Sequence, residues 1–142
     1  MNRLILLSVL AIFSLKLSAQ TAKDVNLVIQ RMLDFSDLQK VYTEEEKNGE
    51  VPLIILTNGE IPQNLLVFKF NKRVKIMTPQ ELETFKTMYK GSLDSYFVFD
   101  TLQFNGNEAK IYARFRKNDN IPVHLSLKKE NNNWVVVEGK AG

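Results

Sequence analysis

The second half of the chain alternates between apolar and polar residues, and this pattern limits its possible folds more than any other feature. Short turns rich in Asn divide it into four runs: residues 95–104, 108–117, 121–129 and 134–139. Alternation with a period of two is typical of strands that bury one face, and short turns join antiparallel neighbours. The pattern therefore predicts a four-stranded antiparallel meander.

The chain before the meander opens with helical signals. Thr21 and Asp24 have the spacing of a capping box, which predicts a helix with an apolar stripe. Ser36 and Asp37 favour a break, and a second helical stretch covers about 37–47, where Glu44–Glu46 is interpreted as a solvated helix end. Asn48-Gly49 then has the character of a C-cap.

A hairpin and a third helix follow. Residues 51–57 and 65–70 are apolar, and Asn58-Gly59 between them is a strong hairpin signal. In the segment 78–81 (TPQE), Thr78 suits an N-cap, the proline suits the first helical position, and the glutamate closes a capping box. This predicts a helix that ends near Lys90.

The sequence predicts an α+β class, because the helices and the hairpin come first and the sheet follows them. The order of elements, with the final strand NNNWVVVEG, resembles the NTF2-like superfamily over residues 22–139. This superfamily includes nuclear transport factor 2, the ketosteroid isomerases and the SnoaL-like proteins. The resemblance implies a cone in which three helices and a hairpin pack on the curved four-stranded meander. A cystatin-like or other helix-on-curved-sheet domain is the alternative.

Residues 1–19 have the order of a secretory signal peptide. Arg3 gives a positive start, residues 4–15 are almost all apolar, and a short segment ends at Ala19. A transmembrane anchor needs about 20 apolar residues, and a buried N-terminal helix lacks an amphipathic face here. We expect cleavage after Ala19, with Ala22 as the alternative position.

Residues 20–142 are then expected to be one exported α+β domain, because a chain of 142 residues fits a single domain. The L-S-A-Q junction and the absence of an N-glycosylation sequon favour the periplasm or exterior of a Gram-negative bacterium. The formal charge is +3, but cleavage removes Arg3 and Lys16 and leaves 17 basic against 16 acidic residues. No cysteine is present, which excludes disulfides, thiol nucleophiles and Cys-ligated metals.

Alternation brings basic side chains onto one face of two meander strands. The predicted face comprises Lys110, Tyr112, Arg114, Arg116, His124 and Lys128. One interpretation is a platform for an anionic glycan or lipid headgroup. The other is an ordinary solvated outer face. Nucleic acid is not an expected partner, since the mature charge is small.

Asp100 interrupts the alternation of the first meander strand and lies among apolar neighbours. It either faces a pocket, where burial would raise the pKa of its carboxyl, or marks a β-bulge that turns it outward. Tyr42, Tyr89 and Tyr96 are the other candidates to line such a pocket. No residue is assigned a catalytic role, because the strand that holds the catalytic Asp in ketosteroid isomerases reads Leu53-Ile54-Ile55-Leu56 here.

Other chemistries find little support. The single His offers no metal set without further ligands, and no phosphate-binding loop, dinucleotide fingerprint or nucleophile elbow occurs, so no cofactor is predicted. The leading hypothesis is a non-enzymatic envelope domain that binds a small ligand or a protein partner. The alternatives are a pocket hydrolase or isomerase that uses Asp100 with a Tyr, and a homo-oligomeric assembly component such as a homodimer. No later segment is expected to span a membrane.

Overall fold

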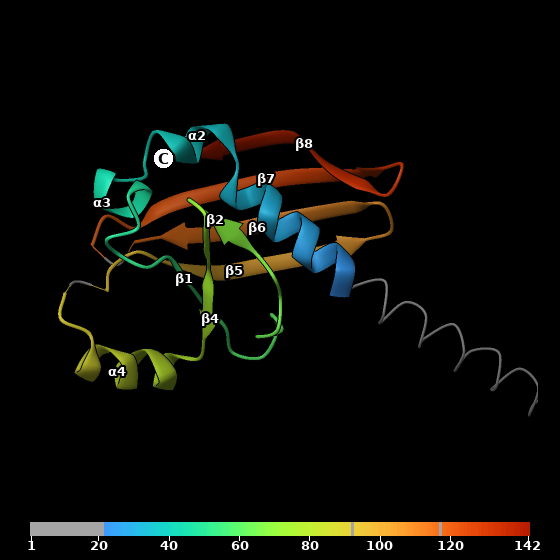
Figure 1. The fold of residues 1–142 in the computed structure, drawn as a ribbon. Coiled ribbons are helices and arrows are strands. Elements are labelled where there is room, and N and C mark those ends of the chain that lie inside the picture. Colours follow the sequence, from blue (N-terminus) through green and yellow to red (C-terminus); the bar gives the residue numbers. More distant parts are fainter. Residues whose placement is uncertain (1–21, 92, 117) are drawn as a thin grey trace, which may run out of the picture.

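The computed structural model describes residues 22–91, 93–116 and 118–142 (Figure 1). The predicted signal peptide, its Ala19 cleavage position and Thr21 lie outside these residues. Within them, a six-stranded sheet in the order β4-β1-β5-β6-β7-β8 forms the centre of the fold. No helix in these three ranges is long and apolar enough to cross a membrane.

The larger part of the sheet is antiparallel and follows chain order. It consists of β5 (Tyr96–Asn105), β6 (Glu108–Phe115), β7 (Ile121–Glu130) and β8 (Asn133–Ala141). Burial along β6 alternates without a break, so Ala109, Ile111, Ala113 and Phe115 all lie in the core. The period-two pattern in the sequence therefore predicts which face of these strands is buried.

The predicted fold of a four-stranded meander is wrong, because two further strands extend the sheet. β1 (Ile54–Leu56) pairs in parallel with both β5 and β4 (Lys75–Met77). Ile54 and Ile55 point to opposite faces and are both fully buried. A short strand that is apolar on both faces is typical of a parallel sheet covered on both sides.

The predicted hairpin between residues 51–57 and 65–70 is also wrong. The Thr57 hydroxyl accepts hydrogen bonds from the N–H groups of Gly59 and Ile61, at 3.1 Å each, and this closes a local turn. The chain then runs on to a separate small hairpin of β2 (Phe68–Lys69) and β3 (Lys72–Arg73). The Asn58-Gly59 turn thus leads away from β1 rather than back along it.

The helices differ in how well local signals define them. Instead of one helix over 37–47 there are two single turns, α2 (Ser36–Gln39) and α3 (Glu44–Lys47), and Thr43 caps the second. Asn48 is the C-cap of α3, and Gly49 follows at a φ of 75°. The predicted third helix is present as α4 (Pro79–Met88), with Thr78 as its N-cap.

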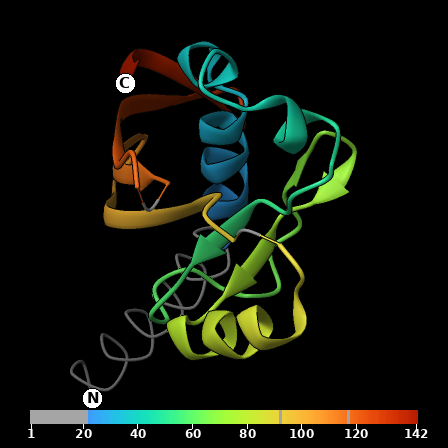
Figure 2. The same ribbon diagram turned by 90° about the vertical axis from the view of Figure 1, so that its left-hand side faces the viewer.

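The main core lies between the meander strands and the helix over residues 22–33, which crosses one face of the sheet (Figures 1 and 2). Trp134 of β8 is buried there, and its indole N–H donates to Asp24 Oδ1 at 3.0 Å. Lys129 Nζ lies 3.1 Å from the same oxygen, and Arg31 Nε donates to the Trp134 carbonyl at 2.9 Å. Asp24, which was expected in a capping box, therefore fastens this helix to the β7–β8 hairpin.

A smaller core lies on the opposite side of β1. It contains Ile54, Leu82 and Leu93, and the half-buried rings of Phe85 and Tyr89 pack against it. Leu82 is the buried residue that α4 contributes. The two aromatic residues thus stand at the end of α4, at the margin of a thin core, where they border a cleft.

Candidate ligand-binding cleft

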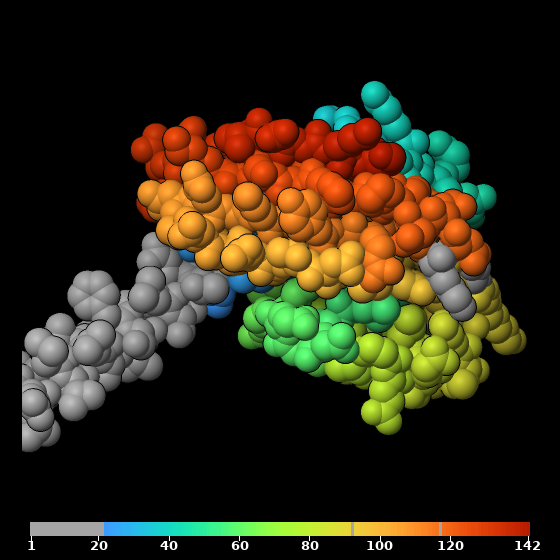
Figure 3. Space-filling view, turned by 180° about the vertical axis from the view of Figure 1, so that it is seen from behind, coloured from blue at the N-terminus to red at the C-terminus, as the bar shows by residue number. Residues whose placement is uncertain are grey.

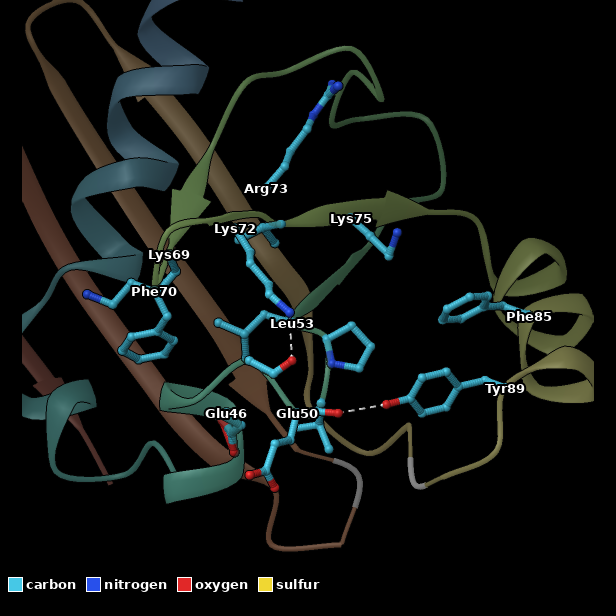
Figure 4. A pocket seen from close by; sticks show the side chains of 14 residues that line it. Glu46, Glu50, Leu53, Lys69, Phe70, Lys72, Arg73, Lys75, Phe85 and Tyr89 are labelled. Carbon is cyan, nitrogen blue, oxygen red and sulfur yellow. Dashed lines mark hydrogen bonds between the residues drawn. The ribbon is translucent and has the colours of Figure 1, made fainter.

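A cleft of about 460 Å³ opens where four segments meet (Figure 4). Its sides are the chain that follows α3, the β2–β3 hairpin, the start of β4 and the C-terminal end of α4. These segments are far apart in the sequence. The parallel pairing of β1 with β4 brings them together, because it sets Ile54 opposite Lys75 and so leads residues 51–53 alongside residues 72–74.

One wall of the cleft is aromatic. Phe85 and Tyr89 are four residues apart, at the spacing of neighbours on one helix face, and their ring centroids are 5.5 Å apart at an interplanar angle of 28°. The Tyr89 hydroxyl donates to the Glu50 carbonyl at 3.0 Å, which fixes the ring across the opening. Pro52 and Leu53 add further apolar surface at the floor.

The other wall carries positive charge. Lys72 Nζ donates to the Gly49 carbonyl at 2.8 Å, Lys75 Nζ lies 5.7 Å from the centroid of the Phe85 ring, and an Arg73 amino group donates to the Leu65 carbonyl at 3.0 Å. Among the residues that the structure describes, none of these three cations has a carboxylate partner. Figure 4 shows the Arg73 side chain pointing away from the cleft, so Lys72 and Lys75 are the cations at its mouth.

Acidic groups do little to balance this charge. Glu50 is exposed at the rim, whereas Glu46 is fully buried and forms an ion pair of 2.5 Å with Arg116. Lys69, the remaining cation of the lining, is paired with Asp34 at 2.9 Å. The cleft therefore combines an apolar aromatic wall with two lysines whose charges are not neutralised.

Asp100 lies on the outer face of the sheet. The register between β5 and β6 shifts between Phe99 and Thr101, so Asp100 is the extra residue of a β-bulge. Its two carboxylate oxygens accept hydrogen bonds of 2.9 Å from Arg114, and its side chain is 48% exposed. The bulge and the pairing with Arg114 therefore turn the Asp100 carboxyl outward, away from the core.

The three tyrosines proposed with Asp100 lie in different places. Tyr42 is buried in the main core, where its hydroxyl donates to the Leu33 carbonyl at 2.9 Å. Burial and the negative charges of Glu46 and Asp34 raise the pKa of its phenol far above the usual value. Tyr96 packs half-buried against the core beneath α4, and Tyr89 lines the cleft. The structure does not bring Asp100 and these tyrosines into one site.

The predicted basic face is largely an exposed outer surface of β6 and β7, seen in Figure 3. Its exposed members are Lys110, Tyr112, Arg114, His124 and Lys128. Arg116 is not among them: its backbone has a φ of 70°, and its side chain reaches inward to Glu46 and the Val41 carbonyl. This residue ends the strand in a left-handed conformation, which the alternation pattern does not foresee.

The outer face also carries acidic residues. Asp100 pairs with Arg114, Glu108 lies opposite Lys128, and Glu138 lies opposite Ser126. The Tyr112 and His124 rings meet edge to face at 4.7 Å beside a shallow hollow of about 370 Å³. Because charges of both signs alternate here, the surface is mixed rather than a basic platform.

The residues that form the cleft were missed by sequence reasoning, apart from Tyr89. No motif in the sequence assigned a role to Lys72, Arg73 or Lys75. Three cations within four positions are a usable signal, but the aromatic wall is supplied by another segment. Within the described residues, no group of three or more His, Asp or Glu side chains could hold a metal ion.

Comparisons with protein-family models, with curated proteins and with solved structures find no match to this chain. The resemblance to the NTF2-like superfamily stays a prediction from the order of elements.

Proposed function

We propose that this protein is an exported, non-enzymatic binding domain of the bacterial envelope and that the cleft holds a small ligand. The observation that carries the proposal is the pairing of an aromatic wall with two lysines that lack carboxylate partners. Ligand sites are typically concave and mostly apolar, with a few polar groups that fix orientation. The signal-peptide pattern at residues 1–19 supports export.

The position of Asp100 argues against the pocket-enzyme alternative. That hypothesis requires a cavity beside its carboxyl, whereas both carboxylate oxygens are engaged by Arg114 on the outer face. Assembly through a second copy stays a prediction from the sequence. Sedimentation of the exported protein at micromolar concentration tests it directly, since a monomer contradicts it.

Binding in the cleft is tested by fragment screening with amide chemical-shift mapping on the exported protein. We expect hits to move the signals of Phe85, Tyr89 and Lys72 together, and Phe85→Ala to weaken these hits. Tyr112→Ala, on β6 and outside the cleft lining, is the matched aromatic control and should leave them unchanged. Hits that map only to the outer face, or none at all from a library of neutral and charged fragments, contradict the proposal.

Export is tested separately, by fractionation and N-terminal sequencing. The protein is expected in the periplasm or medium, beginning at Gln20 or Lys23. Recovery of chains that still begin at Met1 contradicts this part of the proposal.

A further inference from the structure

Resting on the proposed function, we propose a chemical class for the ligand of the cleft: an anion attached to a ring. The anionic group would lie between Lys72 and Lys75, and the ring would pack against Phe85 and Tyr89. The juxtaposition of these four side chains around one opening carries the inference (Figure 4).

The first step concerns charge. Both lysines are exposed, and both contact neutral groups: a carbonyl oxygen for Lys72 and an aromatic ring for Lys75. Hydrogen bonds between ammonium groups and anionic oxygens are shorter and stronger than those to neutral acceptors. An acidic ligand group is therefore a better partner for either lysine than the one it has.

The second step concerns geometry at Lys72. Its bond to the Gly49 carbonyl uses one of the three ammonium donors, so two remain for a ligand. Gly49 permits this close approach, because a Cβ atom there would lie 2.7 Å from Lys72 Cε. The charged end of Lys72 is thus held in place before a ligand arrives, which reduces the entropy lost on binding.

The third step concerns the ring. Lys75 Nζ lies 5.7 Å from the centre of the Phe85 ring, so an acid bound to that lysine is next to an aromatic surface. Phe85 and Tyr89 stack on each other, and both contribute apolar surface to the lining of the cleft. Aromatic rings and the apolar faces of sugar rings pack well on such surfaces. A bare inorganic anion would leave this wall unused.

The inference is tested by calorimetry at low salt with matched probes. The ring-borne anions are 1-naphthyl phosphate and glucose 6-phosphate, and the controls are 1-naphthol, glucose and inorganic phosphate. We expect at least one ring-borne anion to bind tenfold or more tightly than its neutral counterpart and than inorganic phosphate. The tighter of the two identifies the ring as aromatic or sugar.

Variants locate the site. The double variant Lys72→Met/Lys75→Met should weaken the preferred probe at least tenfold and remove its advantage over the neutral counterpart. Lys110→Met and Lys128→Met, which remove cations from the outer face, should leave binding unchanged. A probe that still binds tightly to the double variant overturns the assignment of the two lysines.

The outcomes separate this inference from the proposed function. Equal binding of the neutral and anionic probes in the cleft overturns the ligand class but leaves a binding domain. Tightest binding by inorganic phosphate overturns the requirement for a ring. If none of the probes binds, the ligand class is overturned, and the fragment screen decides the proposed function independently.

Discussion

At the scale of single residues, the pair of Glu46 and Arg116 shows how one unusual backbone conformation redirects a side chain. Arg116 has a φ of 70°, which is uncommon for a residue with a Cβ. Its side chain is 11% exposed and meets Glu46, whose side chain has no exposure at all. One Glu46 oxygen, Oε2, is buried without a hydrogen bond. The pair joins α3 to the end of β6 beneath the cleft.

Removing one partner of this pair should be costly. We expect Arg116→Met to lower the free energy of unfolding by about 3–5 kcal/mol, because it leaves a buried carboxylate without a countercharge. Arg114→Met breaks an ion pair whose side chains are about half exposed and screened by solvent, and should cost far less. Urea unfolding monitored by circular dichroism gives both values. Similar losses in the two variants would show that the Glu46 pair is not an important buried contact.

Tyr42 predicts a specific loss of stability at alkaline pH. Burial, with the charges of Glu46 and Asp34, raises the pKa of its phenol in the folded state above the value of about 10 expected when unfolded. The neutral phenol is therefore favoured by folding, and this stability is complete below pH 10 and declines as the pH rises above it. Tyr42→Phe cannot ionise and escapes the decline.

The variant should thus be less stable than the wild type near pH 7, by about 0.5–1.5 kcal/mol for the lost hydrogen bond to Leu33. Above pH 10 the difference should shrink and then reverse. Urea unfolding at pH 7.5 and at pH 11 measures it, with Tyr112→Phe on the outer face as the control for loss of one tyrosine. A difference that stays constant with pH would contradict the argument.

At the scale of elements, the bulge in β5 joins two halves of the strand whose apolar residues alternate out of phase. The bulge lets the apolar residues of both halves face the core. Phe97 and Phe99 face the core before it, and Leu102 and Phe104 face the core after it. Asp100 is the residue that the regular pattern does not need. Without it, Phe99 and Leu102 would still face inward, on either side of an outward Thr101.

Deleting Asp100 should therefore be tolerated. We expect the deletion variant to unfold cooperatively with a loss of no more than about 1–2 kcal/mol, within the range of ordinary single changes. Deleting Gln103 is the matched control, because it moves Phe104 to the outer face and should destabilise the protein far more. Thermal unfolding compares the two. A protein without Asp100 that fails to fold would show that the bulge itself is required.

The sequence predicts these elements to different degrees. Local chemistry sufficed for α4, whose Thr78 cap and Pro79 are where the sequence places them, and for the buried face of β6. It failed for β1, because Asn58-Gly59 has the form of a hairpin turn and the parallel partners lie about 20 and 40 residues away. The apolar character of both faces of β1 was the available signal for a parallel sheet.

The candidate site was less predictable than the fold for a physical reason. Tyr89 was identified as a pocket residue, but Lys72 reaches the cleft from another segment, which the parallel pairing of β1 with β4 brings close. Arg116 was predicted on the outer face because alternation holds only for extended backbone. Its left-handed backbone conformation turns the side chain inward instead. At Asp100, by contrast, the sequence did carry a signal, because the break in alternation marked the position of the bulge.

At the scale of the whole molecule, the two faces of the sheet are unequally covered. The main core draws on all four meander strands and on the helix over residues 22–33, whereas the core beneath α4 has only three buried members among the described residues: Ile54, Leu82 and Leu93. Regions with few buried apolar contacts open locally at lower free energy than the global unfolding transition. The aromatic wall of the cleft therefore stands on the less stable side of the molecule.

This asymmetry predicts the pattern of native-state hydrogen exchange. Amides of α4 should exchange through local opening, at a free energy clearly below that of global unfolding, while amides of β6 should exchange only through global unfolding. A ligand held by Phe85 and Tyr89 stabilises the closed state of α4 and should therefore slow the exchange of its amides. The exchange of the β6 amides should not change, as long as global unfolding remains rarer than local opening. Exchange monitored by mass spectrometry, with and without the preferred probe, measures both effects. If α4 and β6 exchange at the same free energy, the smaller core is as stable as the main one, and the cleft has a rigid wall rather than one that a ligand can stabilise.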